Sequence, residues 1–263
     1  MWQALKRRWQ GRREAAAVAR RPIPDGLWHR TLKRYPFLQR RDPADAAQLS
    51  RMASLFLDRK EFDARPGTRL TDDVVVTIAA HACLPVLHLG LERYDEFVGI
   101  VLHPHTMLAR RSHADDDGVV HEYDEELLGE AGQRRPLVLS WHDVRRTGVL
   151  DTGVLCVVIH ECAHVLDWGD GDINGIPALP ADLPLREWTQ ALQAEYEAFV
   201  ARVDGGDPTT TLDPYGAESI EEFFAVASEA FFVAPRAMKA EHPVLYGVFV
   251  RFYRQDPAEE MPD

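Results

Sequence analysis

The chain has 263 residues, of which 46% are hydrophobic and 27% charged, enough for one medium globular domain to bury a core without disulfide or metal staples. This composition excludes disordered, collagen-like and disulfide-scaffold proteins. Residues 1–21 hold seven basic residues and one acidic residue, so the remaining residues carry a formal charge of −18 within a total of −12. Such an acidic body repels phosphate backbones, and no nucleic-acid partner is expected.

The first 45 residues are predicted to form a basic lead-in. Trp2, Leu5 and Trp9 recur at helical spacing, which predicts a short amphipathic helix that lies on the fold or contacts an anionic membrane or acidic partner. Prolines then punctuate residues 22–36. We expect residues 46–263 to form a single domain, because no repeat or shift in composition divides them.

Helices and short strands alternate along this domain. The periodicity predicts a helix over 43–62 and another that begins at Thr71 or Asp72, runs toward Leu91 and is bent or ended by Pro85. Residues 97–103, 119–123 and 137–141 predict strands of a small mixed sheet. Further helices are predicted over 149–168, 185–203 and 219–232, with a last one from Pro243. The expected fold class is therefore α+β and rich in helices.

Cellular location is predicted from features that are missing. The sequence has no run of 18 apolar residues, and its basic start is too short and too charged for a signal peptide. Its three cysteines show no paired spacing, which is typical of a reducing compartment. We therefore expect a cytoplasmic protein without an integral membrane segment.

Residues 160–164 read His-Glu-Cys-Ala-His within an apolar stretch that is predicted to be helical. Positions four apart lie one turn from each other on the same face, so His160 and His164 can present both imidazoles to one ion. Glu161 lies about 100° further around the helix, where it can act as a general base on a water held by the metal. The motif predicts half of a tetrahedral zinc site.

A third ligand is expected from the later stretch DPYGAESIEEFFAVASEAFF. Glu222 and Glu229 share one face of this predicted helix, whose phenylalanines supply packing, and an inward-facing carboxylate there needs a partner such as zinc. Glu218 and Glu221 are the alternatives, although acidic residues near a helix start are usually solvated.

With these segments in place, the sequence resembles the zinc-dependent peptidase family typified by the Mlc titration factor A. Five blocks carry the resemblance in the family's order, including VVIHECAHVLDWGDGDINGIP and DPYGAESIEEFFAVASEAFF; the blocks span residues 71–94, 129–144, 157–177, 213–232 and 242–257.

The resemblance implies one zinc ion per chain, with His160, His164 and Glu222 as ligands and Glu161 as catalytic base. It also implies that Tyr215 lies near the metal, where a phenol can donate a hydrogen bond to an oxyanion. The implied fold is the gluzincin-like, helix-rich architecture of glutamate-liganded zinc proteases. Cys162 replaces the family's usual bulky apolar residue, and we expect it to pack rather than bind metal.

Several further residues are candidates for supporting roles. Asp167 and Glu229 are candidates to orient a ligating imidazole, or are simply a helix-end cap and a surface acid. Residues 137–141 are a candidate edge strand for pairing with a substrate backbone. The histidines and acids between His103 and Asp117 show no aligned metal spacing, so a solvated loop is expected there.

The expected function is hydrolysis of peptide or aminoacyl amide bonds, and the resemblance favours aminopeptidase-like action on a peptide substrate. The alternative is a regulatory protein that binds and sequesters a transcriptional repressor of the Mlc type, with a weakly catalytic zinc site. An intact Glu161 and a tyrosine at 215 favour catalysis, because a structural zinc needs a closed fourth position and no base.

Overall fold

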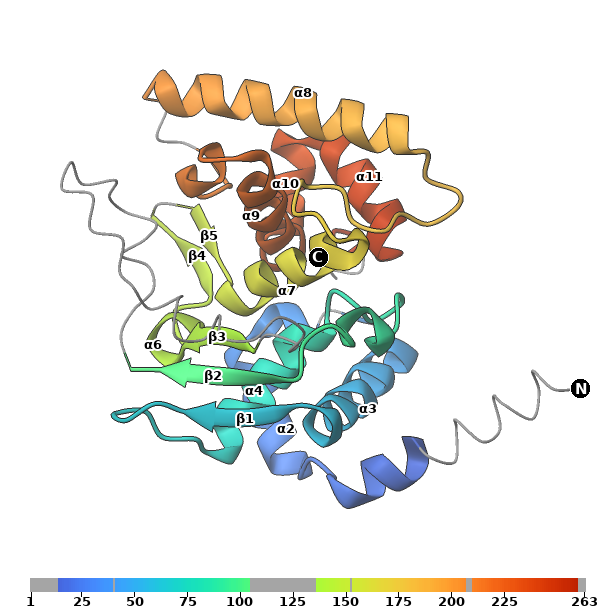
Figure 1. Ribbon diagram of the computed structural model, residues 1–263, viewed down its shortest axis with the longest axis vertical. Helices are drawn as coiled ribbons and strands as arrows, with labels where there is room; N and C mark the ends of the chain where they lie inside the picture. Colours follow the sequence, from blue (N-terminus) through green and yellow to red (C-terminus); the bar gives the residue numbers. More distant parts are fainter. Residues whose placement is uncertain (1–13, 40, 105–135, 152, 207–209, 260–263) are drawn as a thin grey trace, which may run out of the picture.

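The computed structural model describes residues 14–39, 41–104, 136–151, 153–206 and 210–259. Helices predominate among them, and strands form one small parallel sheet and one separate antiparallel pair (Figure 1). The prediction of a helix-rich α+β protein is confirmed. No helix in the described ranges is long and apolar enough to cross a membrane.

In the first part of the chain, helices lie beside the parallel sheet (Figure 1). They include α2 (Asp25–Arg34), α3 (Pro43–Arg59) and α4 (Asp72–Cys83), and residues 14–20 are also helical. Thr71 caps α4 by accepting a hydrogen bond from the Val74 amide, as its position predicted, and α4 ends before Pro85. Helix α2 lies within the segment that was predicted only as a proline-punctuated lead-in.

The sheet contains β1 (Glu61–Ala64), β2 (Gly99–His103) and β3 (Leu137–Ser140), all parallel and in that order. Within the described ranges β3 therefore has a free edge, as expected for residues 137–141. The strand is shorter than predicted, because Ser140 caps a short helix, α6 (Trp141–Val144). Similarly, the helix predicted over 43–62 ends at Arg59, and β1 follows it.

The prediction of a helix over 149–168 is wrong in its first half. Residues Gly148–Leu150 (β4) and Gly153–Leu155 (β5) form an antiparallel hairpin, and the helix begins only at Val157. Gly148 and Gly153 both have positive φ, +153° and +127°, which a helix does not allow. Val149 and Val154, which lie inside the predicted helix, therefore belong to strands.

The second part of the chain is a cluster of helices (Figure 1). It comprises α7 (Val157–Asp167), α8 (Leu185–Asp204), α9 (Ile220–Val233), α10 (Pro235–Glu241) and α11 (Pro243–Tyr253), of which α10 was not predicted. Helix α9 is buried along nearly its whole length, between α7 on one side and α8, α10 and α11 on the others. Aromatic rings fill the contacts; Trp188 of α8, for example, stacks on Phe249 of α11 with 5.5 Å between centroids.

Short 3-10 helices connect these elements: η1 (Pro36–Leu38), η2 (Leu91–Tyr94), η3 (Trp168–Asp170) and η4 (Pro214–Ala217). Three predictions lie outside the described residues: the amphipathic start with Trp2, Leu5 and Trp9, the strand over 119–123, and all of the His103–Asp117 segment beyond Pro104.

Candidate metal centre

Helix α7 carries both histidines of the motif on one face. The side chains of His160 and His164 lie one turn apart, with 4.8 Å between ring centroids and an angle of 83° between the rings. His160 is 3% exposed, because α9 and η4 cover it, and the side chain of His164 is 19% exposed. The i, i+4 spacing therefore brings two imidazoles together at the edge of the helical core.

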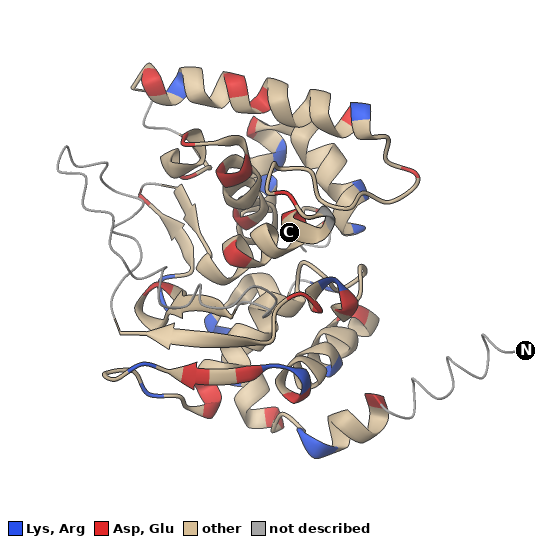
Figure 2. Cartoon of the chain, viewed as in Figure 1, with Lys and Arg blue, Asp and Glu red and all other residues tan. Residues whose placement is uncertain are grey.

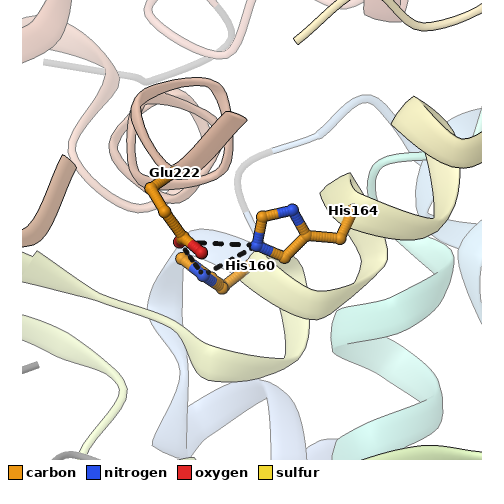
Figure 3. A group of neighbouring side chains, drawn as sticks. All are labelled: His160, His164 and Glu222. Atoms are coloured by element: carbon orange, nitrogen blue, oxygen red, sulfur yellow. Dashed lines mark hydrogen bonds and ion pairs between the residues drawn. The ribbon is translucent and has the colours of Figure 1, made fainter. Parts of the chain in front are cut away.

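Helix α9 supplies the third group. Ser219 caps this helix by accepting a hydrogen bond from the Glu222 amide, at 3.4 Å, which places Glu222 in the first turn. From there its carboxylate points across to the two imidazoles of α7 (Figure 3). The helix face that predicted Glu222 as an inward-facing acid is the face that packs on α7.

The three groups fit the first coordination shell of zinc. Oε2 of Glu222 lies 3.0 Å from Nε2 of His160 and 3.4 Å from Nε2 of His164, and the two nitrogens are 3.2 Å apart. Zinc–ligand bonds of about 2.0–2.1 Å in a tetrahedron correspond to ligand separations of about 3.3 Å. The same oxygen is buried and makes no well-formed hydrogen bond within the described chain, so an ion would satisfy it.

Glu229 contacts the other ring nitrogen of His160. Its Oε1 lies 2.7 Å from Nδ1 of His160, and both side chains are buried. A carboxylate only accepts hydrogen bonds, so Nδ1 carries the proton and Nε2 presents its lone pair to the cluster. This contact shows that Glu229 is not a surface acid and that it lies against an imidazole of the cluster.

The local charge favours a cation. Helices α7 and α9 carry five carboxylates and no lysine or arginine (Figure 2). Burial raises the pKa of Glu222, but hydrogen bonds and charge from the two imidazoles in their protonated form lower it by more, so its pKa lies well below the usual range and the group is ionised. Around a metal ion the same imidazoles would be neutral, and the cation would favour the ionised carboxylate in their place. Two neutral imidazoles and one carboxylate are a donor set typical of catalytic zinc.

Two further residues of the predicted site lie beside this cluster. Tyr215, in η4, is half-buried, and its ring centroid is 6.1 Å from that of His160. Glu161 is half-buried on α7, and its carboxylate has no hydrogen-bond or ion-pair partner among the residues that the structure describes. A carboxylate without such a partner is available to a water or a substrate.

Asp167 does not contact His164 through a hydrogen bond. It is fully buried, and its Oδ2 accepts a hydrogen bond from the Gly175 amide at 2.8 Å, which fixes the loop after α7. Burial raises the pKa of Asp167, although the amides of this loop partly offset the effect. Asp167 is thus a loop anchor in this structure.

The remaining candidate residues lie outside the ligand cluster. Cys162 is 1% exposed, and burial raises the pKa of its thiol to about 12, so it packs in the core as expected. Glu218 is exposed, and neither it nor Glu221 belongs to the ligand cluster found among the described residues.

Two supporting residues were missed by the sequence analysis. The Asp213 side chain caps η4 by accepting a hydrogen bond from the Tyr215 amide at 3.0 Å. Gly153 allows β5 to approach this segment, because a Cβ there would lie 2.8 Å from the Asp213 nitrogen. The Asp-Pro-Tyr sequence, with a capping residue before proline, was a signal for the first; the contact with Gly153 has no local signal.

Comparisons with known proteins show the family to which the chain belongs. Residues 6–254 match the family described as glucose-regulated metallo-peptidase M90. The chain is 34% identical to Mlc titration factor A of Klebsiella pneumoniae (strain 342) over 239 residues, 89% of this chain and 88% of that protein. It is 34% identical to Mlc titration factor A of Salmonella arizonae over 242 residues, 90% of this chain and 94% of that protein.

A third relative, an uncharacterised protein of Synechocystis, is 34% identical over 239 residues, 90% of this chain and 86% of its own length. The matched family segment includes α7 and α9 in full, and therefore the whole ligand cluster. The chain belongs to the glucose-regulated metallo-peptidase family M90.

Proposed function

We propose that this protein is a zinc-dependent peptidase that hydrolyses peptide or aminoacyl amide bonds, with aminopeptidase-like action on short substrates. The observation that carries the proposal is the separation of 3.0–3.4 Å among the ligand atoms of His160, His164 and Glu222, which suits tetrahedral zinc. Membership of a metallopeptidase family supports it. The meeting of a motif helix with a glutamate-bearing helix supports a gluzincin-like arrangement.

In this proposal His160, His164 and Glu222 hold one zinc ion, which supplies Lewis acidity toward a water and a substrate carbonyl when bound. Glu161 accepts the proton of the attacking water and passes it to the leaving amine. The Tyr215 hydroxyl donates a hydrogen bond to the oxyanion that forms on the carbonyl. The free edge of β3 is the proposed strand for pairing with the substrate backbone.

The test compares the wild-type chain with two variants, Glu222→Ala and Glu161→Gln. Zinc content is measured by elemental analysis, and hydrolysis is followed on a panel of aminoacyl chromogenic substrates. We expect one zinc per wild-type chain, loss of zinc and activity in Glu222→Ala, and retained zinc without turnover in Glu161→Gln. Wild-type rates in Glu161→Gln would show that Glu161 is not the general base. A wild-type chain that binds no zinc would contradict the proposal.

A second candidate function comes from the relatives' name. The name Mlc titration factor A suggests that those relatives interact with the repressor Mlc. This chain covers nearly the whole length of two of them. The alternative is therefore that this chain binds and sequesters a repressor of the Mlc type. Zinc binding without turnover on any substrate, and regulation that survives Glu161→Gln, would favour it.

A further inference from the structure

The carboxylate of Glu229 makes two contacts at once. Its Oε1 lies 2.7 Å from Nδ1 of His160, and its Oε2 accepts a hydrogen bond from the backbone amide of Cys156. Cys156 is the N-cap residue, directly before the first residue of α7, and its own side chain makes no capping hydrogen bond. Glu229 is fully buried on α9, so one side chain joins the start of the motif helix, its first histidine and the neighbouring helix.

From this geometry we infer that Glu229 is a positioning residue that builds the metal site before the metal arrives, by fixing the tautomer of His160 and the start of α7. The inference rests on the ligand set of the proposed function. A buried carboxylate is costly unless donors surround it, and the imidazole Nδ1–H and the Cys156 amide are two such donors.

The position of Glu229 on α9 gives this contact a consequence for Glu222. The two residues are seven apart, two turns of one helix, so α9 presents one carboxylate to the metal side of His160 and another to its opposite side. A shift of α9 against α7 would therefore disturb both the position of the ligand Glu222 and the orientation of the ligand His160. Zinc affinity should depend on Glu229 even though Glu229 does not touch the ion.

Glu229→Gln tests the inference sharply, because an amide has one accepting atom and one donating group. If its oxygen accepts from Cys156, its nitrogen donates to Nδ1 and forces the proton of His160 onto Nε2, which blocks the ligand. If its oxygen accepts from Nδ1–H instead, two donors face each other at Cys156. Either arrangement weakens the site without changing its volume.

The matched control is Glu195→Gln. Glu195 of α8 makes a contact of the same length, 2.7 Å, with Nδ1 of His242, which lies outside the ligand cluster found among the described residues. Both variants therefore remove the same charge from a carboxylate–histidine pair. Only Glu229→Gln should affect zinc.

Three measurements on the full chain test the inference. Competition with a chelator should show zinc affinity 10–100-fold weaker (an order-of-magnitude expectation) in Glu229→Gln and unchanged in Glu195→Gln. Nitrogen-15 NMR of the metal-free wild type at pH 8, with the His160 signals assigned by their loss in His160→Asn, should show the proton on Nδ1. Hydrogen exchange at the Cys156 amide should accelerate in Glu229→Gln.

Zinc affinity of Glu229→Gln within twofold of wild type, or a metal-free wild type with the His160 proton on Nε2, would overturn the inference. Should Glu229→Gln not fold, Glu229→Asp, which is too short to reach both donors, takes its place in the affinity measurement. The tautomer measurement uses metal-free wild type, so it decides the role of Glu229 even if the wild type proves to bind no zinc and the proposed function fails.

Discussion

His81 is a histidine whose role is structural. It is fully buried on α4, with its ring 4.4 Å from that of Tyr35 and 5.3 Å from that of Phe37, measured between centroids. Its Nδ1 lies 2.6 Å from the Thr77 carbonyl oxygen, which requires a proton on that nitrogen. Its Nε2 has no partner within the described chain. Burial lowers the pKa of His81 to about 4, partly offset by the Thr77 carbonyl, so the ring is neutral at physiological pH.

His81 should therefore make the protein less stable in mild acid. In the unfolded chain the ring takes up a proton below about pH 6.5, whereas in the folded protein it does so only near pH 4. The unfolded state thus binds more protons in this window, and the free energy of unfolding falls as pH falls from about 6.5 to about 4. Urea unfolding of metal-free protein should show a drop from pH 7 to pH 5 about 2 kcal/mol larger in wild type than in His81→Gln. Parallel losses in the two proteins would contradict this assignment.

At the scale of elements, what the sequence predicts well is local. The cap of Thr71, the imidazole pair four residues apart and the inward face of α9 all depend on neighbours within two turns, and the structure agrees with each. The start of α7 was misplaced because periodicity alone does not distinguish a short apolar strand from a buried helix, and the positive φ of Gly148 and Gly153 is visible only in the structure.

Contacts between distant segments leave no signal in the local sequence. The Cys156 amide and Glu229 are 73 residues apart, and nothing near either residue indicates the other. Glu229 could be proposed as an orienting group from its helix face, but neither its choice of His160 over His164 nor its contact with the backbone could. The approach of β5 to Asp213, which supports the turn with Tyr215, belongs to the same class.

The close approach of Gly153 to the backbone of Asp213 gives a prediction for the β4–β5 hairpin. Gly153 and Gly148 both have positive φ, but a Cβ at Gly153 would lie 2.8 Å from the Asp213 nitrogen, whereas at Gly148 the nearest atom, the Arg146 carbonyl oxygen, is 4.0 Å away. Gly148→Ala therefore measures backbone strain alone, and Gly153→Ala adds a clash with backbone. We expect Gly153→Ala to lower the free energy of unfolding by about 2 kcal/mol more than Gly148→Ala.

Urea unfolding of both variants measures this difference, and peptidase assays extend it. Because the clash falls next to the cap of η4, Gly153→Ala should also displace Tyr215 and lower kcat, while Gly148→Ala should not. Equal stabilities of the two variants would show that β5 does not support the Asp213 segment.

At the scale of the whole molecule, the ligand cluster joins two elements that are distant in the chain, since His160 and Glu222 are 62 residues apart. Helix α7 provides two nitrogens and α9 one oxygen, and these helices pack against each other at the centre of the fold. Helix α9 in turn contacts α8, α10, α11 and the hairpin, so its position depends on most of the second half of the chain. The ion-binding site between α7 and α9 exists only in the folded protein, because the unfolded chain does not hold the three ligands together.

Zinc should therefore stabilise the fold by mass action. Free zinc at about 100 times its dissociation constant adds about 2.7 kcal/mol to the free energy of unfolding, which for a chain of this size raises Tm by about 5–10 °C. Glu222→Ala should lose most of this increase. Glu221→Ala is the control, since it removes a neighbouring carboxylate of the same helix that lies outside the cluster found in the described ranges, and it should keep the increase. Differential scanning calorimetry with and without zinc measures both. An equal rise in Tm for the two variants would mean that zinc acts elsewhere on the protein, whereas a rise confined to wild type and Glu221→Ala ties the stabilisation to the contact between α7 and α9.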